Sequence, residues 1–140
     1  MKTKSKAGFT LVELMVVAII VAILAAVAIP LMSAQKKRAM ATEGESGLGM
    51  LRTALRGMYA ETGHYNVSPN QTPVLAGAIT NLPGVNASDL NGKYFQSTDY
   101  TLANVGDATY TLQVVGNGTT AVAGATITLD QNGTFNRTGL

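Results

Sequence analysis

An uninterrupted apolar run near the N-terminus constrains this chain more than any other feature. Leu14–Met32 is 19 residues long and carries no charged side chain. As an α-helix it would measure about 28 Å, close to the roughly 30 Å of a bilayer's hydrocarbon core. The run therefore predicts a helix that lies in lipid or is buried in an assembly. Lysines precede it, which favours a cytoplasmic N-terminus, but Lys36, Lys37 and Arg38 follow it and weaken that signal.

The positive charge of the chain is concentrated at this end. The formal net charge is +2, from 10 Lys+Arg against 8 Asp+Glu. Three of the ten cations, Lys2, Lys4 and Lys6, lie in residues 1–8, so the remaining 7 Lys+Arg give a formal charge of −1 against the 8 Asp+Glu. A chain that binds nucleic acid would carry its basic excess on the folded domain. The charge therefore gives no reason to predict nucleic acid as a partner.

Glu13 is the one charged residue in the 24 residues from 9 to 32. An ionised carboxylate in lipid costs several kcal/mol unless it finds a partner, so it indicates a functional role. A secretory signal peptide cut near Ala25–Ala28 would explain the apolar run, and so would a plain membrane anchor. Neither alternative explains the carboxylate.

The residues around Glu13 resemble a known processing signal. The segment Lys6-Ala7-Gly8-Phe9-Thr10-Leu11-Val12-Glu13-Leu14 is similar to that of bacterial type IV pilins and of the related type II secretion pseudopilins. The family pattern is a basic leader that ends in Gly, then Phe-Thr-Leu-x-Glu, then an apolar helix with a proline about two-thirds along, here Pro30. The resemblance covers residues 4–38.

This resemblance implies roles for four residues. Gly8 would precede the bond cut by a prepilin peptidase, and Phe9 would become the N-methylated terminus. Glu13 would neutralise the N-terminal amine of a neighbouring subunit or its own, and the pair would enforce register because a misplaced subunit leaves both charges unpaired. Pro30 lacks an N–H and clashes with the carbonyl four residues back, so a kink or local unwinding is expected at Ala26–Pro30.

The remainder of the chain predicts an α+β fold, with a long N-terminal helix packed against a small antiparallel sheet of three to four strands. We expect the helix from Phe9 to about Ala60, with Gly63 as its C-terminal cap. Its apolar stripe is Met40, Leu48, Leu51, Leu55, Met58 and Tyr59, and its other face carries Thr42, Glu43, Glu45, Arg52 and Arg56. Strand candidates are Tyr100–Leu102, Ala108–Val115, Thr126–Asp130 and Thr134–Asn136, with a short helix around Pro73–Thr80.

Four segments follow from these patterns. They are a cleaved leader at 1–8, a transmembrane or filament-core helix at 9–32, an amphipathic continuation of that helix at 33–62, and a globular head with a connecting loop and the sheet at 63–140.

The residue inventory does not favour an enzyme. His64 is the single histidine and there is no cysteine, so a catalytic dyad, a zinc site and a disulfide are not expected. The four aspartates of the head are spread too far apart for a calcium loop; they are Asp89, Asp99, Asp107 and Asp130. We expect no catalytic residues, no cofactor and no metal.

The resemblance implies a major pilin-like structural subunit of a type IV pilus, held first in the inner membrane and then in an extracellular filament. Its partners would be identical subunits, the prepilin peptidase and methyltransferase, and the inner-membrane assembly machinery. The alternatives are a pseudopilin or minor pilin, and a single-pass surface binding protein that never assembles. The lack of a calcium-site match favours a pilin over a pseudopilin.

Overall fold

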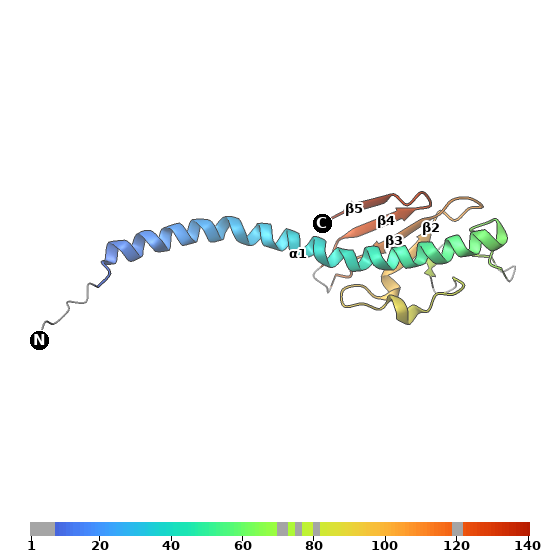
Figure 1. The fold of residues 1–140 in the computed structure, drawn as a ribbon, viewed down its shortest axis with the longest axis horizontal. Helices are drawn as coiled ribbons and strands as arrows, with labels where there is room; N and C mark the ends of the chain where they lie inside the picture. The colour runs from blue at the N-terminus through green and yellow to red at the C-terminus, as the bar shows by residue number, and fades with distance from the viewer. Residues whose placement is uncertain (1–7, 70–72, 75–76, 80–81, 119–121) are drawn as a thin grey trace, which may run out of the picture. The chain divides into compact units, whose positions relative to one another are not determined.

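The computed structural model describes residues 8–69, 73–74, 77–79, 82–118 and 122–140 (Figure 1). The chain divides into two compact units, residues 1–35 and 36–140, and each is described by itself. Helix α1 spans Leu11–Thr62 and so contributes to both. Of the leader expected at 1–8, only Gly8 lies within the described residues.

Helix α1 is capped at both ends. At its start, Thr10 Oγ1 accepts a hydrogen bond from the Glu13 N–H at 3.3 Å, and the Glu13 carboxylate accepts one from the Thr10 N–H at 2.8 Å, which together form a capping box. At its end, Gly63 has φ of 77° and its N–H donates to the Tyr59 carbonyl at 2.8 Å. That left-handed conformation favours glycine, so the expected cap is confirmed. The expected start at Phe9 was two residues early.

Helix α1 continues through Pro30. The Ser33 hydroxyl donates to the Pro30 carbonyl oxygen at 2.8 Å. A proline removes only one bond of the helical ladder, and the bonds on either side keep the backbone helical. The continuous helix excludes local unwinding at Ala26–Pro30 in the single chain, and the alternative expectation of a kink at this proline stays a prediction.

The apolar part of α1 is uncovered. The large apolar side chains from Phe9 to Met32 are 50–84% exposed. By length and composition alone, α1 qualifies as a membrane-spanning helix. A surface this apolar and this extensive indicates contact with lipid or with other protein.

The second unit, residues 36–140, includes the second part of α1 and is called the head from here on. It contains one antiparallel sheet in the order β1-β2-β3-β4-β5. The strands are β1 Gly77–Ala78, β2 Tyr100–Ala103, β3 Thr111–Val115, β4 Thr126–Asp130 and β5 Phe135–Thr138. Each pairs with its neighbour in sequence; in the β3–β4 ladder, for example, Leu112 lies opposite Leu129. The expected α+β class is confirmed, with the two-residue β1 added to four longer strands.

The connection between α1 and β2 differs from the expectation. In place of a short helix around Pro73–Thr80, Gly77–Ala78 pairs with β2, and Pro73 forms an isolated bridge with Val67. Thr80 lies outside the described residues. Two short 3₁₀ helices follow, Ala87–Leu90 and Ser97–Asp99.

Two strand boundaries also differ. Strand β3 begins at Thr111 and not at Ala108, because the Gly106 N–H donates to the Thr109 carbonyl at 2.9 Å and closes a tight turn there. Strand β5 spans Phe135–Thr138, so it begins and ends later than the expected Thr134–Asn136. A turn that contains Asn132-Gly133 precedes β5, in which the Gly133 N–H donates to the Asp130 carbonyl at 3.0 Å and Gly133 has φ of 90°.

The core of the head lies between α1 and the sheet. Alternate residues of β2, β3 and β4 are buried and face the helix; they include Leu102, Leu112, Val114, Ile127 and Leu129. The buried apolar residues of the α1 stripe are Met40, Leu48, Leu51, Leu55 and Met58. Tyr59 is exposed and stacks on Tyr65, with ring centroids 4.5 Å apart. The stripe therefore packs the core as its spacing predicts, except for Tyr59.

Two glycines of α1 make its closest contacts with the rest of the head. A Cβ atom at Gly44 would lie 3.0 Å from Phe95 Cε2, and one at Gly47 would lie 2.5 Å from Tyr100 Cζ. Both distances are shorter than an ordinary carbon–carbon contact of about 3.5–4.0 Å. Glycine weakens a helix, but here it lets two buried aromatic rings reach the helix backbone.

Glu43 does not lie on a free outer face, which corrects the sequence-based expectation. Its Oε1 accepts hydrogen bonds from the backbone N–H groups of Tyr94 at 2.8 Å and Phe95 at 2.9 Å, and its Oε2 accepts one from Lys93 at 3.2 Å. Three consecutive loop amides are thereby satisfied by one carboxylate of α1. The loop before β2 is fixed to the helix through Glu43.

Candidate functional site

The first candidate site is the start of α1. The Glu13 carboxylate is positioned by Thr10: Oε2 accepts from the Thr10 N–H and from the Thr10 hydroxyl, each at 2.8 Å. Within the described residues, Oε1 accepts no hydrogen bond. A carboxylate offers about four acceptor positions, so this group can still receive a further cation or donor.

Thr10 is the residue that sequence reasoning missed. It was included in the motif by resemblance but given no role. The signal was present, because Thr-x-x-Glu before an apolar helix is the pattern of a capping box. Its effect is that the Glu13 side chain is oriented before any second molecule arrives.

Gly8 and Phe9 precede the helix and are exposed. A Cβ at Gly8 would meet no heavy atom within 4 Å, and the Phe9 side chain is 84% exposed. The bond between them lies in backbone that forms no helical hydrogen bonds, so an enzyme can bind it in an extended form. Pro30 lies 17 residues beyond Glu13 on the same helix, about 26 Å away at 1.5 Å per residue. The structure therefore places Gly8, Phe9 and Glu13 at the start of α1 and Pro30 well away from them.

His64 contributes to the end of α1. Its Nδ1 lies 3.6 Å from Asp107 Oδ1, and both side chains are exposed. The same Oδ1 accepts a hydrogen bond from Asn66 Nδ2 at 2.8 Å. In the described part of the chain, no group of three or more His, Cys, Asp or Glu side chains could hold a metal ion. An exposed pair of this kind stabilises a folded chain only slightly.

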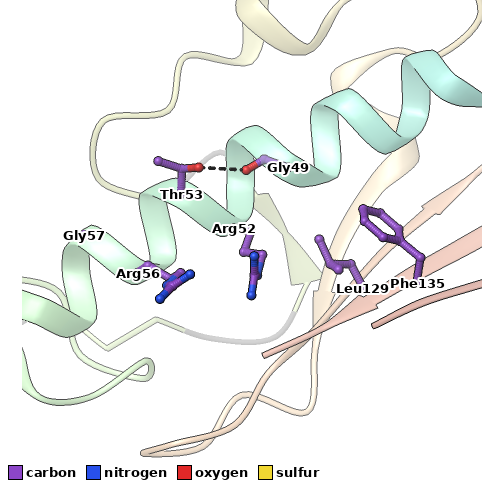
Figure 2. A pocket seen from close by; sticks show the side chains of 7 residues that line it. All are labelled: Gly49, Arg52, Thr53, Arg56, Gly57, Leu129 and Phe135. Atoms are coloured by element: carbon purple, nitrogen blue, oxygen red, sulfur yellow. Dashed lines mark hydrogen bonds between the residues drawn. The ribbon is translucent and has the colours of Figure 1, made fainter. Parts of the chain in front are cut away.

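The second candidate site is an open groove in the head between α1 and the β4–β5 edge, with a volume of about 480 Å³ (Figure 2). Its helix side carries Arg52 and Arg56, and its sheet side carries Leu129 and Phe135. The remaining lining residues are Gly49, Thr53 and Gly57. Sequence reasoning placed the two arginines on the outer face and gave them no function.

The Arg52 guanidinium is held against the turn before β5. A Cβ at Gly133 would lie 2.6 Å from Arg52 Nη2, so the end of the arginine side chain rests close against this turn. Arg52 Nε is buried and has no hydrogen-bond partner in the described chain. Burial and Tyr65 raise the pKa of Tyr110, while Arg52 and Arg56 act in the opposite direction. The groove is therefore positively charged over an apolar floor.

Comparisons with known proteins bear on both ends of the molecule. A family model described as the "Prokaryotic N-terminal methylation motif" matches residues 3–29. The fimbrial protein EcpB of Eikenella corrodens is 40% identical over 68 residues, which cover 49% of this chain and 43% of that protein. The chain thus aligns with less than half of the length of this relative.

The fold has a solved counterpart. The non-core minor pilin PilV of Neisseria meningitidis matches with a TM-score of 0.50 and 21% sequence identity, over 76% of this chain and 90% of that one. At this identity the match shows the fold alone. Together with the methylation motif and the fimbrial relative, it agrees with a capped apolar helix that continues into an α+β head. The chain is a type IV pilin-like protein that carries the prokaryotic N-terminal methylation motif.

Proposed function

We propose that this chain is the major structural subunit of a type IV pilus. It is inserted in the inner membrane as a precursor, cut by a prepilin peptidase between Gly8 and Phe9, methylated at Phe9, and passed by the assembly machinery into a filament on the cell surface. Identical subunits are its main partners. The apolar stretch of α1, which is uncovered in the single chain, lies in lipid first and in the filament core afterwards.

The observation that carries this proposal is the arrangement of Glu13. Thr10 binds one carboxylate oxygen and orients the group, and Oε1 is left to receive an ammonium. Cleavage before Phe9 creates such an ammonium at the same end of the helix. In an apolar surrounding each charge alone is unfavourable, so docking that joins them is favoured over docking that leaves them apart.

Mass spectrometry of the chain extracted from membranes and filaments tests the processing. The expected chain begins at N-methylated Phe9. An intact Met1 terminus, or a chain cut after Ala28, would refute the proposal.

Three variants separate the charge of Glu13 from its capping role. Glu13→Gln keeps an acceptor for Thr10 but cannot neutralise an amine, so we expect a processed, membrane-inserted protein that is missing from sheared filaments. Glu13→Ala should behave in the same way. Thr10→Ala removes the cap, a loss of about 1 kcal/mol, but keeps the charge, so filaments should persist at reduced yield. Normal filament yield from Glu13→Gln would rule out charge pairing as the mechanism.

The amount of the chain in purified filaments tests its status as the major subunit. Quantitative mass spectrometry should find it as the most abundant pilin-like protein of the filament. A substoichiometric amount would assign it instead as a minor pilin.

A further inference from the structure

The groove beside Arg52 and Arg56 contains positive charge that the described chain does not neutralise. The two side chains leave α1 about one turn apart on the same side of the helix (Figure 2), and like charges at this spacing repel each other. Among the described residues, Arg137 forms an ion pair with Glu45 and His64 lies close to Asp107, and neither arginine of the groove forms such a contact. An anion that entered the groove would relieve this repulsion.

Gly49 and Gly57 line the same groove, and the fold of the single chain does not require them. A Cβ at either position would meet no heavy atom within 4 Å, in contrast to Gly44 and Gly47. Glycine weakens a helix, so these two positions lower the stability of α1 with no packing gain inside the described chain. They leave room for another molecule to approach the helix closely.

Glu61 carries a negative charge that complements the positive charge of the groove. It is exposed in the last turn of α1, a turn that contains no basic residue. The carbonyl end of a helix carries partial negative charge, so a carboxylate there is unfavourable unless a cation is near. Among the described residues, no hydrogen bond or ion pair involves the Glu61 carboxylate.

One copy of the chain cannot join these charges. Arg56 and Glu61 are five residues apart on a helix, which separates them by about 7.5 Å along its axis and by about 140° around it. They therefore project from nearly opposite sides of α1. In a head-to-tail assembly, however, different faces of successive copies meet, and two complementary patches on opposite sides are what such a contact requires.

The separation along the helix agrees with the register of the proposed filament. Pairing Glu13 with the Phe9 amine of a neighbour shifts that neighbour by about 6–10 Å, since two of the four intervening steps are helical and two precede the helix. Copies in a helical filament share one translation along its axis. The shift therefore brings Arg56 of the neighbour level with Glu61, and in both pairs the acid lies C-terminal to the cation.

We propose that Glu61 of each subunit pairs with Arg56 of the adjacent subunit, with the last turn of one α1 docked at the groove between Gly49 and Gly57 of the next. This inference rests on the proposed filament function and adds a contact between heads to the contact between helix starts. In it, the head stretch of α1 runs along the filament axis.

Charge reversal tests the pair in the full-length chain in cells. Arg56→Glu and Glu61→Arg should each be processed to methylated Phe9 and should each lower the yield of sheared filaments at least about tenfold. The double variant Arg56→Glu/Glu61→Arg should restore the yield to within about threefold of the wild type. Ala108→Glu introduces the same carboxylate at an exposed loop position and should leave the yield unchanged.

Cross-linking tests the same contact without relying on charge. The chain has no cysteine, so two variants can be co-expressed, Arg56→Cys and an epitope-tagged Glu61→Cys. A short bismaleimide should link them in filaments into a dimer that contains both forms. Either variant expressed alone should remain mostly monomeric under the same treatment.

The outcomes separate this inference from the filament proposal. Wild-type filaments, their loss in Glu13→Gln, and normal yield from both Arg56→Glu and Glu61→Arg would overturn the head contact alone. So would two defective single variants that the double variant fails to restore, or the absence of the mixed cross-linked dimer. A wild-type chain that never enters filaments would instead refute the proposed function itself.

Discussion

Gly47→Ala is the change that most directly probes how α1 packs on the head. A Cβ at position 47 would lie 2.5 Å from Tyr100 Cζ and 2.6 Å from Cε1, about 1 Å closer than an ordinary contact. The Tyr100 side chain is 2% exposed, so its ring has no open space into which it could move. Overpacking of this kind costs about 1–3 kcal/mol, here toward the upper end, and the better helix propensity of alanine returns about 1 kcal/mol. We expect a net loss of about 2 kcal/mol in the free energy of unfolding.

Gly49→Ala, two residues further along α1, is the matched control. No heavy atom would lie within 4 Å of its Cβ, so alanine should stabilise the chain by about 0.5–1 kcal/mol. The two alanine variants should therefore differ by roughly 3 kcal/mol although they make the same substitution in one helix.

Urea unfolding of the full chain in mild detergent, followed by near-ultraviolet circular dichroism, measures this difference. The chain has five tyrosines, all in the head, and no tryptophan, so the signal reports the packing of the head. In a Tyr100→Leu background the side chain ends short of the crowded ring atoms, and Gly47→Ala should become nearly neutral. A Gly47→Ala midpoint at or above that of the wild type would refute the close contact between Tyr100 and the helix backbone.

Three further predictions concern the head. Glu43→Ala leaves three backbone N–H groups without their acceptor and should lower the free energy of unfolding by about 2–3 kcal/mol; a loss no larger than that of Glu45→Ala, whose partner Arg137 is exposed, would contradict the anchoring role. Burial, then Glu43 and Asp99, raise the pKa of Tyr100 from 10.0 to about 12. The contribution of the neutral Tyr100 side chain to thermal stability should therefore be fully present below pH 10 and should be lost between pH 10 and 12. Melting curves of Tyr100→Phe should show a smaller fall over this range. The hydrogen bond from the Thr134 N–H is the largest cause that lowers the pKa of Asp130 from 3.8. The contribution of the Asp130 carboxylate to stability is present above pH 3.8 and should be lost as the pH falls below it. Melting curves of Asp130→Asn should therefore depend less on acid pH.

The general architecture was predictable because it depends on strong local patterns. The length of the apolar run, the three-to-four spacing from Met40 to Met58 and the left-handed glycine at 63 each correspond to one structural feature. The alternation in β3 and β4 identified the central strands in the same way. These signals involve neighbours in sequence, so they need no knowledge of the tertiary contacts.

The features that were missed depend on contacts between distant residues. Glu43 reaches loop amides 50 to 52 residues away, so its helix periodicity alone placed it on the wrong face. The role of Gly47 is not visible in the sequence, because its partner, Tyr100, lies far along the chain and a glycine within a helix by itself indicates only a lower helix propensity. At the helix start the signal was local. Thr10 was missed there because the motif was interpreted for cleavage, methylation and charge pairing, and not for helix capping.

In the proposed filament, the two charge sites on α1 have different roles in assembly. The family motif covers residues 3–29, which include the Gly8–Phe9 junction and Glu13. In the proposed filament, the Glu13 pair lies within this motif, so it would set the register of a subunit without distinguishing one chain that carries the motif from another. Selection of the correct partner would then depend on residues beyond position 29. Arg56 and Glu61 satisfy that condition because they lie in the head part of α1. Their charges lie on nearly opposite sides of the helix, and the distance between them along the helix matches the shift set by the pair at the helix start. Replacing this pair by the corresponding residues of another pilin-like subunit should change which chains co-assemble while leaving cleavage and methylation at Phe9 intact.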